Sequence, residues 1–225
     1  GPLSAGIIDW ERLRDGNGSF GEYQAFLSSY PDWPGMSLLR KQGEAEMAGA
    51  SADQVLGFFR SGLPQTGTGS LALIRAFQDK GQDDAARKEA VRAWRTLPMS
   101  ANEQDSFLAY HAAILADHHD GRTATMLREG YTEDARRMLP LNSPLTRAIA
   151  EARVALQADD KGVDGLVAAV PEKGLTSGGL AYDRFRWRIR KDLYDGAGDL
   201  LLERSTSAQA LGDPEQWADW RRRLA

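Results

Sequence analysis

The chain has 225 residues, of which 42% are hydrophobic and 27% are charged, proportions that are ordinary for a folded globular protein. Its formal net charge of −4 disfavours a general affinity for nucleic acid. It contains no cysteine, which excludes disulfides and thiolate metal sites. No apolar run approaches the roughly 20 residues that a membrane-spanning helix needs, so we predict no membrane span.

The first residues, Gly-Pro-Leu-Ser at positions 1–4, are typical of the remnant that a tag-removing protease leaves. We therefore expect residues 1–6 to be a tag remnant and a disordered start. Residues 7–225 are expected to form a single helical domain. Because the helical pattern continues to the last residues, we expect this domain to be truncated at its C-terminal end.

Helical spacing of apolar residues runs through the rest of the chain, interrupted by short segments that carry Gly, Pro, Ser or Asp. Three Ser-x-x-Glu/Gln motifs, which start at Ser19, Ser51 and Ser100, fit capping boxes that satisfy free backbone N–H groups of a first helical turn. In chain order the predicted helices are 7–15, 20–29, 34–48, 52–61, 69–79, 82–96, 101–117, 120–129, 132–139, 144–158, 162–170, 178–193, 195–204 and 214–224.

The short connections between these helices predict the architecture. Loops of 2–6 residues place consecutive helices as antiparallel neighbours. Similar turns at 80–83, 129–132 and 193–196 each precede a helix with small-x-x-apolar spacing, a pattern similar to a degenerate tetratricopeptide repeat. We therefore predict an all-α fold, a right-handed superhelix (α-solenoid) of short antiparallel helix hairpins.

One segment fits two structures. From Arg184 to Arg190, arginines alternate with Phe, Trp and Ile, which would give a strand one apolar face and one arginine face suited to a polyanion. As a helix, the segment places Arg184 and Arg188 on one side and separates them from the other arginines. The length of 178–193 and its helical neighbours favour the helix. A structural ion-pair helix is then the favoured interpretation over a polyanion site.

Several segments, taken in order, resemble a known family. Residues 30–46, 58–67, 117–141, 180–191 and 203–225 are similar to the N-terminal helical region of soluble lytic murein transglycosylases, the alphaproteobacterial members above all. The resemblance implies a periplasmic enzyme in which helical hairpins carry a separate catalytic domain. That domain would cleave the β-1,4 bond between N-acetylmuramic acid and N-acetylglucosamine without a metal. One glutamate would act as acid and then base, leaving a 1,6-anhydromuramoyl end.

The chain departs from the family at its chemistry. The Glu-Ser pair and the Gly-Leu-Met-Gln-type segment of the catalytic domain are absent, and the nearest fragment is 165–167. We therefore predict no catalytic residue, no cofactor and no metal ligand. The resemblance implies a non-catalytic scaffold domain whose partners, through the full-length enzyme, are peptidoglycan or muropeptides. The alternative is a tetratricopeptide-like adaptor that binds a protein or peptide on a concave face; a nucleic-acid binder is disfavoured by charge.

Four residues are candidates for contacts with a glycan or a partner. Trp33 lies in a turn and Trp220 lies near the C-terminus, where an aromatic ring could stack on the apolar face of a sugar. Arg184 and Arg188 are the candidate cationic contacts. Trp187, by contrast, is expected to lie in the core. A metal site at His118, His119 and Asp120 is disfavoured, because adjacent helical side chains point about 100° apart.

Overall fold

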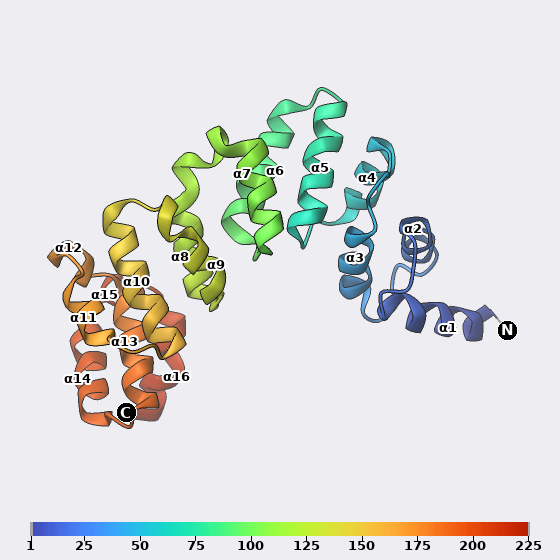
Figure 1. Cartoon of the computed structure of the whole chain (residues 1–225). Helices are drawn as coiled ribbons and strands as arrows, with labels where there is room; N and C mark the ends of the chain where they lie inside the picture. The colour runs from blue at the N-terminus through green and yellow to red at the C-terminus, as the bar shows by residue number, and fades with distance from the viewer. Residues whose placement is uncertain (1, 225) are drawn as a thin grey trace. The chain divides into compact units, whose positions relative to one another are not determined.

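The computed structural model describes residues 2–224, with side-chain environments for residues 6–223. Every regular element in this range is helical, from α1 to α16 with three 3-10 turns (Figure 1), so the predicted all-α class is confirmed. The right-handed superhelix stays a prediction. No helix among the described residues is long and apolar enough to cross a membrane.

The contacts divide the chain into two compact units. Unit 1 ends at His118 and unit 2 begins at His119. We expected one domain over residues 7–225, and each unit is described by itself below. The first helix begins at Pro2, ahead of the predicted start at residue 7, so the helical pattern extends into the segment expected to be disordered.

Unit 1 consists of helices that pack on their neighbours in sequence. Contacts join α2 to α3, α4 to α5, α5 to α6 and α6 to α7, the arrangement expected of helix hairpins with short loops (Figure 1). The elements are α1 (Pro2–Arg14), α2 (Phe20–Ser29), α3 (Met36–Ala45), α4 (Ala52–Phe58), η1 (Phe59–Ser61), α5 (Gly67–Asp79), α6 (Asp83–Thr96), α7 (Ala101–Leu115) and η2 (Ala116–His118).

The core of unit 1 depends on close helix contacts. Tyr23 and Leu39 are fully buried, and the Tyr23 hydroxyl donates to the carbonyl of Leu13 at 2.9 Å. A Cβ on Gly43 would lie 3.0 Å from the Phe58 ring and 3.1 Å from Tyr23, so the glycine lets α3 approach both. The predicted caps begin two of these helices, because the hydroxyls of Ser51 and Ser100 accept from Gln54 N–H and Glu103 N–H.

Unit 2 has the same style of packing around α10 and α13. Contacts join α8 to α9, α10 to α13, and α13 to α14. The short helices α12 and α15 were not predicted, because four residues are too few to show helical periodicity. The elements are α8 (His119–Glu129), α9 (Thr132–Met138), η3 (Leu139–Leu141), α10 (Pro144–Ala158), α11 (Val163–Ala168), α12 (Glu172–Leu175), α13 (Gly178–Arg190), α14 (Tyr194–Arg204), α15 (Ala208–Leu211) and α16 (Pro214–Leu224).

Helix α13 settles the ambiguous arginine segment. It begins after Ser177, whose hydroxyl accepts from Leu180 N–H, and it ends at Arg190. Leu180 packs in one apolar cluster, with Trp187 partly buried against it, and Phe185 packs in another. The helix therefore buries two faces, and the arginine-lined strand surface does not exist.

Candidate functional site

A groove runs between helices of unit 1. Its volume is about 920 Å³, and α5, α7 and the segment 45–55 line it. Small residues of the segment 48–50, together with Ala72 and Ala76 of α5, leave room between the helices. Such a trough between helices can hold an extended chain or a small molecule.

The wall of the groove formed by α7 carries its most distinctive side chains. Tyr110 is 78% exposed and lies at the rim, while the adjacent His111 is only 7% exposed. Burial lowers the pKa of His111 below its ordinary value, so its imidazole is neutral at pH 7. Ser106, one turn earlier on α7, adds a hydroxyl to the same lining. This wall offers aromatic stacking and neutral hydrogen-bonding groups.

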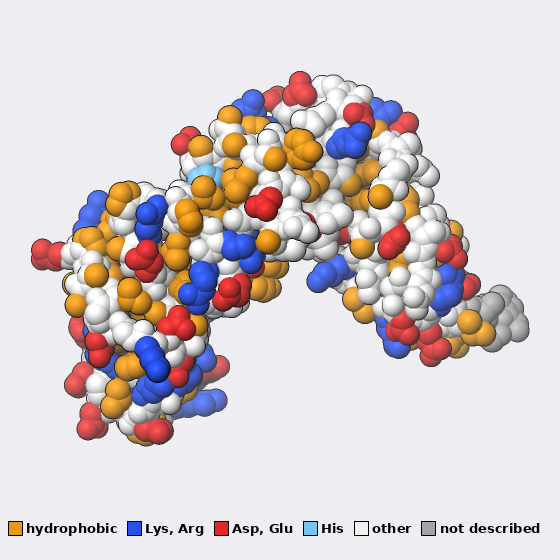
Figure 2. Space-filling view, in the orientation of Figure 1, with side chains coloured by type: hydrophobic (Ala, Val, Ile, Leu, Met, Phe, Trp, Pro, Cys, Tyr) orange, Lys and Arg blue, Asp and Glu red, His pale blue; other side chains and the backbone are white. Residues whose placement is uncertain are grey.

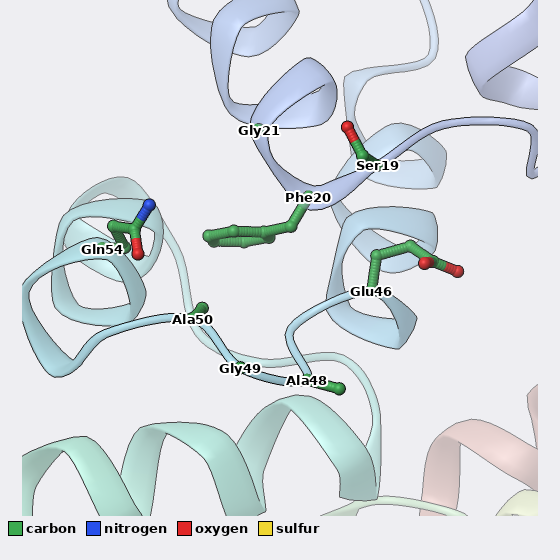
Figure 3. Close-up of a pocket in the computed structure, with 8 residues that line it drawn as sticks. All are labelled: Ser19, Phe20, Gly21, Glu46, Ala48, Gly49, Ala50 and Gln54. Atoms are coloured by element: carbon green, nitrogen blue, oxygen red, sulfur yellow. The ribbon is translucent and has the colours of Figure 1, made fainter.

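A smaller pocket of about 340 Å³ adjoins the groove through the shared segment 48–50. Figure 3 shows the Phe20 ring reaching between Gln54 and Glu46, so one edge of a core side chain forms its wall. Phe20 is 8% exposed and its ring centroid lies 5.3 Å from that of Phe58. The pocket therefore combines one apolar wall with the polar side chains of Glu46 and Gln54.

A buried carboxylate stands at the start of α5. Glu44 is fully buried, and its oxygens accept from the backbone N–H of Gln65 at 2.8 Å and of Thr66 at 2.8 Å. The Thr66 hydroxyl donates to the same carboxylate at 2.6 Å. These groups are free donors at a helix N-terminus, so Glu44 caps α5 from another helix.

Glu44 has the raised pKa that a proton donor needs, but its position does not suit that role. Burial raises its pKa above the ordinary value, against the hydrogen bonds from Thr66 and Gln65. A general acid must also reach the atom that it protonates. Neither the groove nor the smaller pocket is lined by Glu44, and both of its oxygens hold backbone donors. We therefore assign it a structural role.

Two further charged groups complete this polar network. Glu103 of α7 accepts from Thr68 N–H at 2.7 Å. Burial opposes its ionisation, but the hydrogen bonds from Ser100 and Thr68 prevail and its pKa is lowered. Arg92 pairs with the buried Glu89 at 2.6 Å and also donates to Pro64 O at 3.1 Å. Helices α3, α6 and α7 thus all hold the segment that leads into α5.

Unit 2 contains two buried ion pairs. Arg153 of α10 contacts Asp183 of α13, with 2.6 Å between Nε and Oδ2. Burial raises the pKa of Asp183, and Arg153 opposes the shift. Arg122 of α8 pairs with Asp134 of α9 at 3.0 Å, and burial lowers the pKa of Arg122 to about 10. Both pairs tie neighbouring helices together.

The two candidate tryptophans are partly built into the protein. Trp33, in unit 1, is half-buried, and its ring centroid lies 5.1 Å from Tyr30 and 5.9 Å from Phe26. Trp220, on α16 of unit 2, packs edge-on against Phe185 at 5.4 Å. A guanidinium, that of Arg186, also lies 5.8 Å from the Trp220 ring. Their contact with a glycan stays a prediction.

The structure places Arg184 and Arg188 one turn apart on α13, on the side that faces α14. Arg188 donates to the carbonyl of Gly196 at 2.6 Å. Burial, and then the charge of Arg188, lower the pKa of Arg184. Arg184 and Arg188 therefore lie together. Trp220 packs instead against the apolar cluster that contains Phe185, in the same unit.

Sequence reasoning missed the groove and the buried carboxylates. The available signal was the pair of glycines at the start of α5. A Cβ on Gly69 would lie 2.4 Å from Glu44 Oε2, and one on Gly67 would lie 2.9 Å from Glu103. Two glycines in a first helical turn can therefore indicate that side chains of other helices pack on it.

Among residues 6–223, no three His, Asp or Glu side chains gather in a way that could hold a metal ion. Asp120, considered above as a ligand, instead accepts from Ser143 N–H at 3.0 Å at the start of α10. In the view of Figure 2, basic and acidic side chains are interspersed over the surface, without a continuous basic face. No protein-family model, curated protein or solved structure matches this chain.

Proposed function

We propose that this chain is a non-catalytic helical scaffold domain of a periplasmic lytic murein transglycosylase. The full-length enzyme would cleave glycan strands and leave 1,6-anhydromuramoyl ends, and peptidoglycan or muropeptides would be its partners. The proposal rests on the order of the similar segments and is supported by the succession of helix hairpins. In it, the hairpins continue as a right-handed superhelix that positions a glycan for a separate catalytic domain.

The use of the buried carboxylates is the observation that carries the non-catalytic part. Each buried Asp or Glu among the described side chains already holds backbone N–H groups, an arginine or an amide, and none lines the groove. Glycoside cleavage needs a carboxylic acid that reaches the leaving oxygen. These carboxylates are Glu44, Glu89, Asp134 and Asp183.

The groove is the place where a ligand chain would lie. Its Tyr110 side chain is free to stack on a sugar ring, and Ser106 and His111 supply hydrogen-bonding groups beside it. A glycan strand is extended, with hydroxyls and apolar C–H faces, and this lining suits both.

Two assays with purified murein sacculi test the proposal. The chain should cause no loss of turbidity, and it should sediment with the sacculi. Tyr110→Ala should release it into the supernatant, because the change removes an exposed stacking ring. Tyr194→Ala is the matched control, since Tyr194 is 60% exposed and lies in unit 2. Clearing of the murein would refute the non-catalytic role. Equal sedimentation of Tyr110→Ala and the wild type would refute glycan binding in the groove.

A tetratricopeptide-like adaptor is the second candidate, and the size of the groove favours it. A volume of about 920 Å³ between helices also suits a peptide bound by backbone contacts and small pockets. An array of peptides with varied sequence distinguishes the two candidates. Capture of particular peptides, lost in Tyr110→Ala and combined with no sedimentation on sacculi, would replace the murein proposal by the adaptor.

A further inference from the structure

Two packed helices of unit 2 bring three arginines together. Arg184 and Arg188 lie on α13, and Arg204 lies in the last turn of α14, which packs against α13. Burial lowers the pKa of Arg184, and the positive charges of Arg188 and Arg204 lower it further. The carboxylate of Glu203 opposes this lowering of the pKa, so the cluster contains one carboxylate and three guanidinium groups.

Two of the three arginines donate hydrogen bonds to backbone carbonyls. Arg188 donates to Gly196 O at 2.6 Å. Arg204, whose side chain is only 13% exposed, donates to Leu175 O at 2.9 Å and to Thr176 O at 3.3 Å. Carbonyl groups orient a guanidinium without neutralising its charge. The positive charge of Arg188 is therefore held in place beside Arg184, and the charge of Arg204, held by its carbonyl partners, is offset only by the ion pair with exposed Glu203 at 3.6 Å.

Arg184 differs from the other half-buried and buried arginines of unit 2. Within the described part of the chain, its guanidinium donates no hydrogen bond and has no carboxylate within ion-pair distance, whereas Arg153 has Asp183. Glu203 is 67% exposed and lies nearest to Arg204, at 3.6 Å. A partly buried charge without a partner is costly, and an anion would remove that cost.

We propose that Arg184, Arg188 and Arg204 form a binding site for a small oxyanion, with Arg184 as its principal donor. A guanidinium matches the planar fork of a carboxylate or two oxygens of a phosphate, and both groups share this chemistry. The cluster is local and the visible surface has no continuous basic face, so a single anionic group fits it better than a polynucleotide. The inference goes beyond the proposed function and does not rest on it.

Titration of the whole protein tests the site. The probes are inorganic phosphate and succinate, each against chloride at constant ionic strength, and the signals are the arginine Nε–Hε resonances. In the wild type we expect saturable shifts that include the Arg184 resonance. Arg184→Gln should weaken binding by about tenfold or more, as loss of a charge-assisted fork does. Preference for one probe would identify whether the group is a carboxylate or a phosphate.

Arg221→Gln is the matched control, because it removes an exposed arginine of the same unit that has no ion pair among the described residues. It should bind both probes as the wild type does. Arg184→Lys, which keeps the charge and loses the fork, should bind with intermediate strength. The inference is overturned if the wild type gives no saturable response, or if Arg184→Gln and Arg221→Gln bind equally. Circular dichroism verifies that each variant is folded.

Discussion

Arg153 and Asp183 form an ion pair in the interior of unit 2, where their side chains are 9% and 7% exposed. Gln157 donates to the same carboxylate oxygen at 3.0 Å, so two side chains of α10 hold Asp183 of α13. Such a pair contributes little more than an apolar contact would, but the loss of one partner leaves a buried charge uncompensated.

We therefore expect Asp183→Asn to lower the free energy of unfolding by about 3–5 kcal/mol. Urea denaturation followed by circular dichroism measures the loss. The control is Asp164→Asn, an exposed position on α11 without an ion pair among the described residues, where a change within about 0.5 kcal/mol is expected. Similar stabilities of the two variants would show that Arg153 finds another partner or reaches solvent.

Gly69→Ala tests the cap that Glu44 provides. The new Cβ would lie 2.4 Å from Glu44 Oε2, and the carboxylate cannot move away without breaking its hydrogen bonds to Thr66. We expect a loss of about 1–3 kcal/mol, the cost of unsatisfied buried polar groups. Gly198→Ala should instead stabilise by about 0.5–1 kcal/mol, because helix propensity improves and no atom lies within 4 Å of its Cβ. Gains at both positions would refute the structural role of Glu44.

Local signals explain why much of the fold could be predicted. A capping box such as that of Ser100 and Glu103 lies within one turn, and its residues are read directly from the sequence. The two apolar faces of α13 were also predictable, since helical geometry places Leu180 and Phe185 on different sides. Each of these features depends only on residues that are neighbours along one helix.

The partners of several buried charges could not be predicted, because they lie on helices that are far apart in the sequence. Glu103 was assigned to its own capping box, yet its other oxygen holds Thr68, which is 35 residues away in the sequence. Arg153 and Asp183 are 30 residues apart, and nothing in either helix indicates which acid meets which base. Groove walls share this difficulty, because they depend on the spacing between helices rather than on any one of them.

The contacts of Glu22 predict how the stability of the protein depends on pH. Its carboxylate accepts from the backbone N–H of Ser19 at 2.8 Å and from its hydroxyl, and pairs with Arg12 at 2.8 Å. These contacts lower its pKa from 4.5 to about 2. A lowered pKa in the folded state means that ionised Glu22 stabilises the fold above pH 4.5, and that this contribution is lost as the pH falls towards 2.

The corresponding variant is Glu22→Gln. We expect its free energy of unfolding to fall below that of the wild type at neutral pH, and the difference to shrink between pH 4.5 and about 2. Urea denaturation at a series of pH values measures the difference. Glu11→Gln, at an exposed position of α1, controls for net charge. A difference that stays constant down to pH 2 would contradict the assignment of the shift to Glu22.

Two tryptophans of unit 2 differ in how deeply they are buried. Trp217 is fully buried and donates to Leu211 O at 3.1 Å, whereas Trp187 is half-buried and donates to Asp159 at 3.1 Å. As a core residue Trp187 would lose about 3–5 kcal/mol on replacement by alanine. The structure corrects this expectation, because part of the ring already contacts solvent in the folded state.

We expect Trp217→Ala to lower the free energy of unfolding by about 3–5 kcal/mol, through loss of apolar contact and the cavity that remains. Trp187→Ala should cost about 1–2 kcal/mol, in proportion to the smaller area that it buries. Urea denaturation of both variants under one condition gives the ratio directly. Equal losses would mean that the Trp187 ring is as deeply packed as that of Trp217, and that the apolar cluster of Leu180 closes over it.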